Sequence, residues 1–479
     1  MISSTIFSSS FHKKLQTNVQ KSYREFIEDL RADFENGFNT DTVSPEFLEQ
    51  LDDIIHDETL DHYSPTKFYW LNLVDNLIYV IQMHEELLSA EDATDEELEE
   101  LGETEDELFS FWNESDLAEQ FINLMKEDKA VLEASDHLVP LLENQIIAFY
   151  VLHVNKYHQQ FDDALVYQIV PEIGEGDLGL YLGDQHLFTE FKPKPEGLPA
   201  LALTSVDFDE NEIKVESGNK DLKLKFVKTK PAIKKEDLEL FVLPQCLEGQ
   251  KNHDQFVKNI NKALDRIKKY APHLFTTFKS FTHTIVPVNE EGIVSYSMQS
   301  LPGYSSINLF NRDQIDLMDD LLHENGHHYL NTYLNFQELI NEDDDKIYYS
   351  PWRKALRPVR GIYHATFTFY WALELFVNLN KSTSTEFTKE EKIKIKTRLV
   401  EEYLMLEYCS QDLKHAFKNK KINKDGWKLI QDVYTLINSY QKLAATTLNE
   451  LKSLDKEKHI HLTDLANHLM NMRETYNNK

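Results

Sequence analysis

Residues 314–334 read QIDLMDDLLHENGHHYLNTYL, and this stretch decides how the middle of the chain folds. At 3.6 residues per turn, its apolar and small residues fall on one stripe of a helix. These residues are Ile315, Met318, Leu322, Gly326, Tyr329 and Tyr333. Gly326 lies in the stripe although glycine costs about 1 kcal/mol relative to alanine inside a helix. We therefore predict a helix over 314–334, with another backbone close to it at Gly326.

The same stretch contains the pattern His-Glu-x-x-His, as His323, Glu324 and His327. Side chains four residues apart lie one above the other on a helix, so two imidazoles can bind one metal ion without distorting the backbone. Both histidines fall at the border of the buried stripe, where a metal in a cleft would lie. Asp320, one turn earlier, could orient a ligand histidine by a hydrogen bond or simply favour the helix dipole.

A third ligand has to come from outside this motif, and the apolar segment at 348–379 offers two side chains. It reads YYSPWRKALRPVRGIYHATFTFYWALELFVNL, and its prolines predict a helix that begins near Val359 or Gly361. This helix is apolar nearly all round, so we expect it to be buried. His364 is either the third ligand or a hydrogen-bonded core histidine. Glu374 is either a rival ligand or the partner of an arginine.

Composition excludes several classes of protein. The 479 residues carry 82 acidic and 50 basic side chains, a formal charge of −32, which argues against nucleic acid and against an anionic membrane as partners. The two cysteines exclude a disulfide framework and a thiolate zinc site, so a metal has to use histidine and carboxylate. The most apolar long stretch, residues 69–83, is too short and too polar to span a bilayer. Because we also find no signal peptide, we expect a cytoplasmic protein.

The excess negative charge is concentrated in residues 85–116, which hold 15 carboxylates and neither lysine nor arginine. Such a run is typical of a solvated loop that keeps a protein soluble. The alternative is a collar that attracts a basic peptide.

The pattern along the chain predicts an α+β protein that is predominantly helical. We expect a helical N-terminal region at 1–165 and a β-rich accessory region at 166–245, which is an inserted antiparallel sheet. Residues 246–384 would form a zincin-like core, in which a small sheet packs against the helix that carries His-Glu-x-x-His. Residues 385–479 would form a helical C-terminal region.

Two further strings lie downstream of the histidine motif: Tyr349-x-Pro351-Trp352-Arg353, and Arg357-Pro358-x-x-Gly361-x-x-His364. Over roughly residues 290–375, this combination resembles the HExxH-motif proteins that modify ribosomally made peptides. Members of that family act as iron(II)- and 2-oxoglutarate-dependent peptide β-hydroxylases. The resemblance implies His364 as the third metal ligand, iron(II) and 2-oxoglutarate as cofactors, and a precursor peptide as substrate.

The implied chemistry needs a cation for the far carboxylate of 2-oxoglutarate. Three protein ligands leave one face of the iron open for the keto acid and O₂. A guanidinium is the best partner for the remaining carboxylate because it can form two hydrogen bonds. We expect Arg353 or Arg357 in this role, from the cluster that also includes Arg360. The alternative is that these arginines pair with the acids at 343–345.

Two other functions remain open. In a zinc peptidase, Glu324 would be the general base and zinc would activate a water molecule. In a non-catalytic helical interaction protein, the motif would be degenerate. The strand-like segment GIVSYSMQ at 292–299 suits either enzyme, because an exposed strand edge can bind an extended peptide.

Overall fold

A computed structural model describes most of the chain before residue 82 and after residue 231. The described residues are 5–35, most of 43–81, positions 143 and 146, six strands between 169 and 225, and 232–476 with gaps at 236–237, 243–249, 290, 293, 298, 300–301, 342–345 and 383–385. The acidic runs at 85–116 and 343–345 lie outside the described residues, and so do most of the helices expected before residue 165. The described part is predominantly helical and contains small sheets, as predicted.

The chain divides into two compact units, one made of Gln20–Lys230 and one of Met1–Val19 with Pro231–Lys479. The first unit contains most of helix α1 (Ser9–Glu35), then α2 (Pro45–Ile55) and the short 3₁₀ helix η2 (Glu58–Asp61). Arg31 on α1 joins these helices, because Nη1 forms an ion pair with Asp61 at 2.9 Å and Nε donates to the carbonyl of Ile55 at 2.6 Å.

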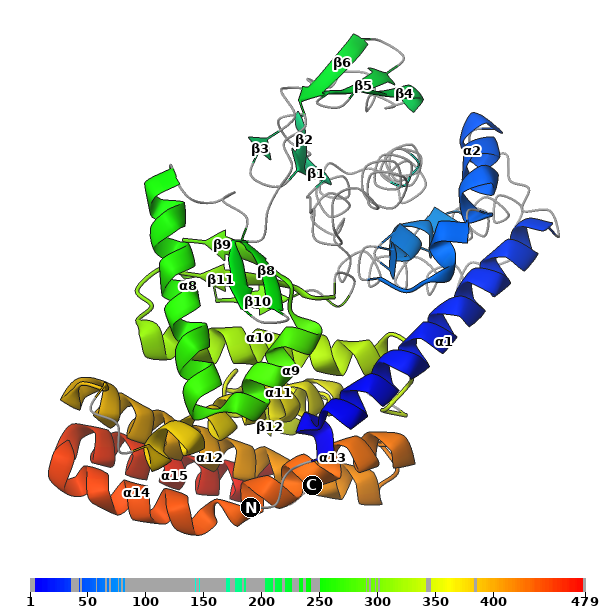
Figure 1. Ribbon diagram of the computed structural model, residues 1–479. Helices are drawn as coiled ribbons and strands as arrows, with labels where there is room; N and C mark the ends of the chain where they lie inside the picture. The colour runs from blue at the N-terminus through cyan, green and yellow to red at the C-terminus, as the bar shows by residue number, and fades with distance from the viewer. Residues whose placement is uncertain are drawn as a thin grey trace, which may run out of the picture. The chain divides into compact units, whose positions relative to one another are not determined.

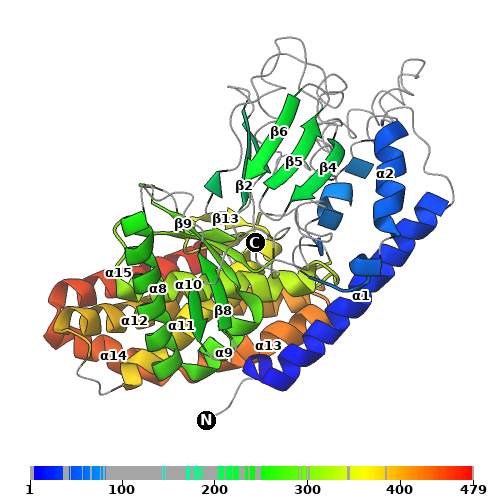
Figure 2. The ribbon, with the colours of Figure 1, turned by 45° about the horizontal axis from the view of Figure 1, so that its top comes forward.

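Six strands follow in this unit and form two antiparallel sheets, in the orders β1-β2-β3 and β4-β5-β6. Figure 2 shows β4, β5 and β6 side by side. The strands are β1 (Ile169–Glu172), β2 (Asp177–Leu182), β3 (Gln185–His186), β4 (Leu203–Asp209), β5 (Glu212–Ser217) and β6 (Lys220–Lys225). Their antiparallel pairing agrees with the alternating pattern seen in the sequence.

The second unit is built on one mixed sheet of five strands, in the order β10-β11-β9-β8-β7. The strands are β7 (Ile233–Lys235), β8 (Leu238–Val242), β9 (Thr284–Val288), β10 (Tyr296–Ser297) and β11 (Tyr304–Asn308). β8, β9 and β11 are parallel, whereas the outer strands β7 and β10 are antiparallel to their neighbours. We had expected 166–245 to form one accessory region, but β7 and β8 join the sheet of the second unit. A strand's alternation fixes which residues share a face, and it does not identify the neighbouring strand.

Helices cover this sheet and form the rest of the unit. In Figure 1, α10 runs along the sheet, and α12 to α15 lie in a layer beyond it. The helices are α8 (Gln250–Tyr270), α9 (Pro272–Phe281), α10 (Gln314–Leu334), α11 (Val359–Lys381), α12 (Lys389–Lys418), α13 (Lys424–Ser439), α14 (Gln441–Leu454) and α15 (Lys456–Tyr476). A hairpin of β12 (Tyr348–Ser350) and β13 (Ala355–Arg357) lies between α10 and α11.

The bounds of α10 follow from its sequence. The side chain of Asp313 accepts hydrogen bonds from the backbone N–H groups of Ile315 and Asp316, and Asp316 accepts one from Asp313 in return. This reciprocal cap satisfies backbone donors that the helix leaves free. The predicted stripe is buried up to Tyr329, and Tyr333 is half-buried. The helix over 314–334 is therefore confirmed.

Gly326 is the point where α10 and α11 meet. A Cβ on Gly326 would lie 2.6 Å from Cδ1 of Trp371 and 3.2 Å from Cα of Thr368. We predicted that another backbone approaches the helix at Gly326, and that backbone belongs to α11. Pro358 precedes the first turn of α11, which is buried along most of its length, as its apolar sequence predicts.

The N-terminal 3₁₀ helix η1 (Thr5–Phe7) packs against the same two helices. The hydroxyl of Tyr329 donates to the carbonyl of Ile6 at 3.2 Å, and the ring of Phe7 lies 4.6 Å from that of Trp371. Both Ile6 and Phe7 are buried. Residues 5–7 are therefore part of the core around α10.

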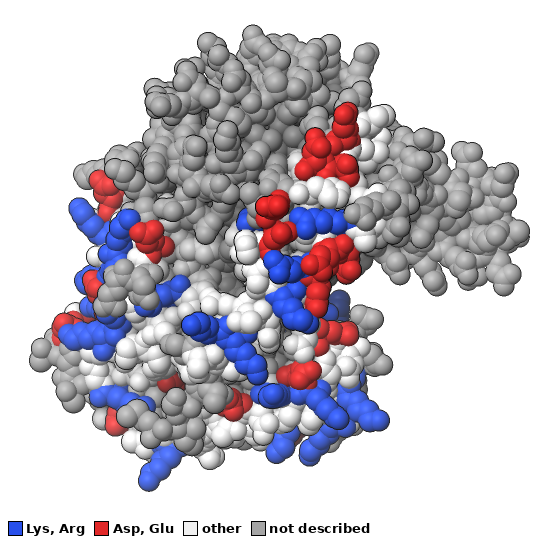
Figure 3. All heavy atoms as spheres, turned by 45° about the vertical axis from the view of Figure 1, so that its right-hand side comes forward, with Lys and Arg blue, Asp and Glu red and all other residues white. Residues whose placement is uncertain are grey.

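The described residues on the face drawn in Figure 3 carry mixed charge: lysine and arginine side chains are interspersed with aspartate and glutamate.

Within the described residues, no helix combines the length and the apolar character needed to cross a bilayer.

Candidate metal centre

His323 and His327 face each other on α10. Their Nε2 atoms are 3.3 Å apart and their ring centroids 4.9 Å apart. Two nitrogens that each lie about 2.1 Å from one metal, at angles of roughly 90–110°, are about 3.0–3.4 Å apart. The two imidazoles therefore fit one metal ion with little movement.

Both histidines are held in the neutral form. Burial, together with the charges of Arg398 and Arg353, lowers the pKa of His323 to about 4. Burial also lowers the pKa of His327 well below its usual value, with contributions from His323 and His364. Neutral imidazole is the form that binds metals, so these rings need not lose a proton at neutral pH.

His364 comes from the second turn of α11 and lies next to His327, with 5.9 Å between the ring centroids. Burial and the charge of Arg360 lower its pKa to about 4. Among the residues that the structure describes, no three histidine, cysteine or acidic side chains are gathered closely enough to hold a metal ion. His364 lies beside the histidine pair, but whether it binds a metal ion stays a prediction.

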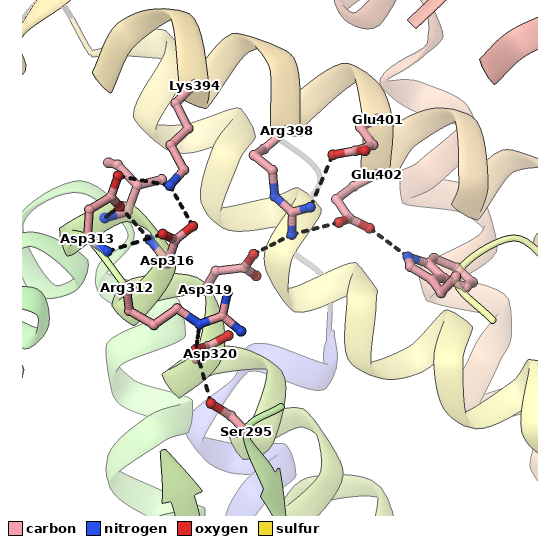
Figure 4. Close-up of polar contacts among 12 residues, drawn as sticks. Ser295, Arg312, Asp313, Asp316, Asp319, Asp320, Lys394, Arg398, Glu401 and Glu402 are labelled. Atoms are coloured by element: carbon pink, nitrogen blue, oxygen red, sulfur yellow. Dashed lines mark hydrogen bonds and ion pairs between the residues drawn. The ribbon is translucent and has the colours of Figure 1, made fainter. Parts of the chain in front are cut away.

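Glu324 and Asp320 point to strand β10. The hydroxyl of Ser297 donates to Oε2 of Glu324 at 2.8 Å, and that of Ser295 donates to Oδ2 of Asp320 at 3.0 Å. Asp320 also forms an ion pair with Arg312 at 3.1 Å (Figure 4). Its bonds therefore go to Ser295, just before β10, and to Arg312; of the two roles that the sequence left open, orienting a histidine and favouring the helix dipole, neither is decided by these bonds.

Burial changes the chemistry of these two carboxyl groups. It raises the pKa of Glu324 to about 8, although the hydrogen bond from Ser297 opposes the shift and Asp320 adds to it. Burial raises the pKa of Asp320 to about 7, with a contribution from Asp319. Both groups can therefore accept or release a proton near neutral pH.

Glu374 lies in a separate network. It forms an ion pair with His273 at 3.1 Å and accepts hydrogen bonds from Tyr370, Tyr440 and Asn378. Burial raises its pKa, but the bonds from His273 and Tyr440 lower it overall. The structure gives Glu374 these four partners, and none of them is an arginine or one of the α10 histidines.

The three arginines before His364 have different surroundings. The positive charge of Arg353 acts on His323, whereas that of Arg360 acts on His364. Arg357 packs against the first turn of α11, with its Nε 3.1 Å from the position of a Cβ on Gly361. Both Arg353 and Arg357 are exposed. Arg353 is thus the predicted cofactor-binding arginine whose charge acts on the histidine pair.

His328 and Asn325 point away from the pair and into the core. Nδ1 of His328 accepts a hydrogen bond from the N–H of Gly303 at 3.1 Å, and its Nε2 contacts Oγ of Ser305 at 2.9 Å. The side-chain amide of Asn325 donates to Thr282 at 2.8 Å. These contacts attach α10 to β11 and to the end of α9.

An aromatic pair that we had not assigned to the site lies against His323. The ring of Phe369 on α11 is 4.3 Å from that of His323, centroid to centroid. The indole of Trp352 is stacked on Phe369 at 4.3 Å, with an angle of 5° between the planes. Its Nε1 donates to Glu402 on α12 at 3.1 Å. The string Pro-Trp-Arg was the only sequence signal for this group.

The described site therefore combines two neutral histidines, a third histidine beside them, a protonatable glutamate and an arginine charge. The histidine pair offers two neutral nitrogens 3.3 Å apart, and Glu324 can accept or release a proton next to the outer strand of the sheet. Comparisons with models of known protein families and with curated protein sequences find no match to this chain.

Proposed function

We propose that this protein is an iron(II)- and 2-oxoglutarate-dependent oxygenase that hydroxylates the β-carbon of a residue in a ribosomally made precursor peptide. The observation that carries the proposal is the neutral pair of His323 and His327, with Nε2 atoms 3.3 Å apart and His364 beside it. In this proposal the three histidines are the metal ligands. The mixed sheet and α10 would then be a zincin-like core, and the enzyme would act in the cytoplasm.

The bound cofactors would supply oxidation, in which O₂ and 2-oxoglutarate are consumed and succinate, CO₂ and the hydroxylated residue are released. The protein's own residues would bind 2-oxoglutarate and orient the peptide. Arg353 is the preferred partner for the far carboxylate of 2-oxoglutarate, because its charge acts on His323. Arg357 is the second choice. Glu324, protonated at neutral pH and bonded to Ser297, would position the peptide.

The outer strand β10 is the proposed place for the peptide. Val294, just before this strand, and Tyr296 in it have 57% and 42% of their surface exposed, respectively, so an added peptide could bury both. Ser295 and Ser297, which alternate with them, bond to the acids of α10. An extended peptide added at the edge of β10 would therefore pass close to Glu324.

A zinc peptidase is the second candidate. Glu324 follows the ligand His323 directly and its carboxyl group lies beside the outer strand, which is where a general base for peptide hydrolysis is needed. Zinc in the histidine pair would activate the water molecule that attacks the peptide bond.

The deciding experiment starts from protein purified without oxygen. It measures bound metal, and then succinate release with Fe²⁺, 2-oxoglutarate, O₂ and the short peptides encoded beside the gene. We expect succinate that depends on both iron and O₂, and a peptide heavier by one oxygen atom. Bound zinc with peptide cleavage and no succinate would instead establish the peptidase.

Two variants complete the test. Glu324→Gln should abolish a peptidase, because the base is lost, but a hydroxylase should keep its iron and part of its activity. The double variant His323→Ala/His327→Ala is the metal-free control. A protein that binds no metal and turns over nothing in any of these assays is a non-catalytic interaction protein.

A further inference from the structure

Within the described residues, Nε2 of His323 has a hydrogen-bonded partner in His327, but its Nδ1 has none. Metal-binding histidines usually donate the N–H of their second ring nitrogen to a carboxylate or a carbonyl, which fixes the ring. Nδ1 of His323 is buried, and no described residue forms a hydrogen bond with it. Asp320, the nearest acid on the same side of α10, is bonded to Ser295 and Arg312. Something other than a hydrogen bond at Nδ1 has to hold this ring.

The aromatic pair of Phe369 and Trp352, which we call the buttress, lies against the ring. Phe369 contacts His323 with 4.3 Å between centroids and 52° between the planes, and Trp352 is stacked on Phe369 at the same distance and nearly parallel. Aromatic contacts of these kinds contribute about 0.5–1.5 kcal/mol per pair beyond the area they bury. Phe369 therefore restricts the space in which the ring of His323 can turn, and Trp352 packs against Phe369.

The buttress is itself anchored in the core. Nε1 of Trp352 donates to Glu402, which is fully buried and forms an ion pair with Arg398 at 3.0 Å. Arg398 also pairs with Asp319, which lies one turn before His323 on α10 (Figure 4). These contacts form a closed series. Asp319 on α10 pairs with Arg398 on α12, Glu402 on α12 accepts from Trp352 in the β12–β13 hairpin, and Trp352 stacks on Phe369 of α11, which contacts His323. Removing one partner of such a buried pair is costly, so the chain tends to keep these contacts together.

We propose that Trp352 and Phe369 are positioning residues, which hold His323 in its metal-binding orientation in place of the usual hydrogen bond. The inference rests on the proposed metal site and concerns how that site is kept in order. Loss of the buttress should therefore weaken metal binding, and not only lower the stability of the protein. Removing a group that orients a metal-binding histidine typically weakens metal binding about 10–100-fold.

The chain contains a matched control for this test. Trp427 on α13 is stacked on Phe417 of α12 at 4.7 Å and 8°, and it is half-buried, as Trp352 is. This second pair does not contact the histidines. Trp352→Leu and Trp427→Leu therefore each remove a stacked indole, but only the first removes one from the buttress.

The experiment titrates the metal-free full-length protein with Zn²⁺ and with Co²⁺, whose visible absorption reports its coordination. We expect Trp352→Leu to bind both ions about 10–100-fold more weakly than wild type and to change the Co²⁺ spectrum. Trp427→Leu should lose thermal stability but bind within about twofold of wild type. Trp352→Phe, which restores a ring on Phe369, should recover most of the affinity.

Wild-type affinity and an unchanged Co²⁺ spectrum in Trp352→Leu would overturn this inference and leave the proposed function standing. A wild-type protein that binds neither ion would overturn the proposed function itself. If Trp352→Leu does not fold, Phe369→Leu decides the matter by the same criteria, because it removes the ring in direct contact with His323.

Discussion

His327 and His328 are neighbours in the chain, but they belong to two regions of α10 that differ in chemistry. On the packing side, both ring nitrogens of His328 have partners, the N–H of Gly303 and the hydroxyl of Ser305. On the site side, Nε2 of His327 faces only Nε2 of His323, at 3.3 Å. Both nitrogens of His328 thus have partners in the core, whereas the Nε2 atoms of His323 and His327 have only each other as hydrogen-bonding partners among the described residues.

This difference separates a structural histidine from a binding one. Two neutral imidazoles that face each other form one N–H···N hydrogen bond, in which the tautomers decide which ring donates. A metal ion between them would instead use a lone pair from each ring. The burial that keeps both rings neutral therefore also prepares them for a metal.

The largest effect that tests this comparison is on metal affinity. His327→Ala should weaken Zn²⁺ binding by more than about 100-fold, beyond the loss of an orienting group. His328→Ala should leave affinity within about threefold, yet lower the free energy of unfolding by about 1–3 kcal/mol, because Gly303 and Ser305 lose a buried partner. Isothermal titration and urea unfolding measure the two quantities. Equal losses of metal affinity in both variants would contradict the assignment of His327 to the site and of His328 to the core.

The next effect concerns the packing side alone. Gly326→Ala should lower the free energy of unfolding by about 1–3 kcal/mol, because its Cβ would lie 2.6 Å from Trp371. Gly361→Ala is the matched control on α11, where the new Cβ would meet only the flexible side chain of Arg357. That change should be neutral or stabilise by up to about 1 kcal/mol. A Gly326→Ala protein as stable as wild type would show that α10 and α11 are not in close contact.

A smaller effect should appear in the pH dependence of stability. Because burial raises the pKa of folded Glu324 to about 8, the native protein binds a proton that the unfolded chain releases near pH 4.5. Wild-type stability therefore falls as pH rises between these values, by at most about 1.4 kcal/mol per pH unit from this group. Glu324→Gln removes this term, so its stability relative to wild type should rise by about 1 kcal/mol from pH 6 to pH 7. A constant difference between the two proteins would contradict the raised pKa.

The smallest expected effect is in the pH dependence of metal affinity, which should be weak. Two histidines with the ordinary pKa of 6.5 would lose about 100-fold in metal affinity between pH 7.5 and pH 5.5, because both must lose a proton. Because the pKa of His323 is lowered to about 4 and that of His327 well below its usual value, the site should lose far less than 100-fold over that range. Zn²⁺ titrations at the two pH values measure this. A 100-fold loss would contradict the lowered pKa values.

Sequence predicted the local features of the site. Helical spacing placed His323 and His327 together, Gly326 marked the contact with α11, and the prolines before Val359 marked where that helix begins. Each of these signals acts within about two turns of a helix, so a single sequence displays it in full.

The features that sequence did not predict involve partners far apart in the chain. Glu374 was weighed as a ligand or as an arginine's partner, yet it pairs with His273, 101 residues away. The stacking of Trp352 on Phe369 and the contact between Ser297 and Glu324 likewise depend on how separate elements pack. A residue's type restricts the kinds of partner it accepts, and only the folded chain selects one.

The bond between Tyr329 and Ile6 joins residues 323 positions apart. During translation, the first turn of the chain leaves the ribosome long before its partners on α10 and α11 are made. Residues 20–230 are all made by then, whereas the unit that contains α10 needs both Ile6 and the later residues of α10 and α11. Contacts of such high sequence separation slow folding, because a long loop must close first. The apolar residues Ile6 and Phe7 would therefore stay exposed in the nascent chain, where a chaperone that holds short hydrophobic segments could bind them.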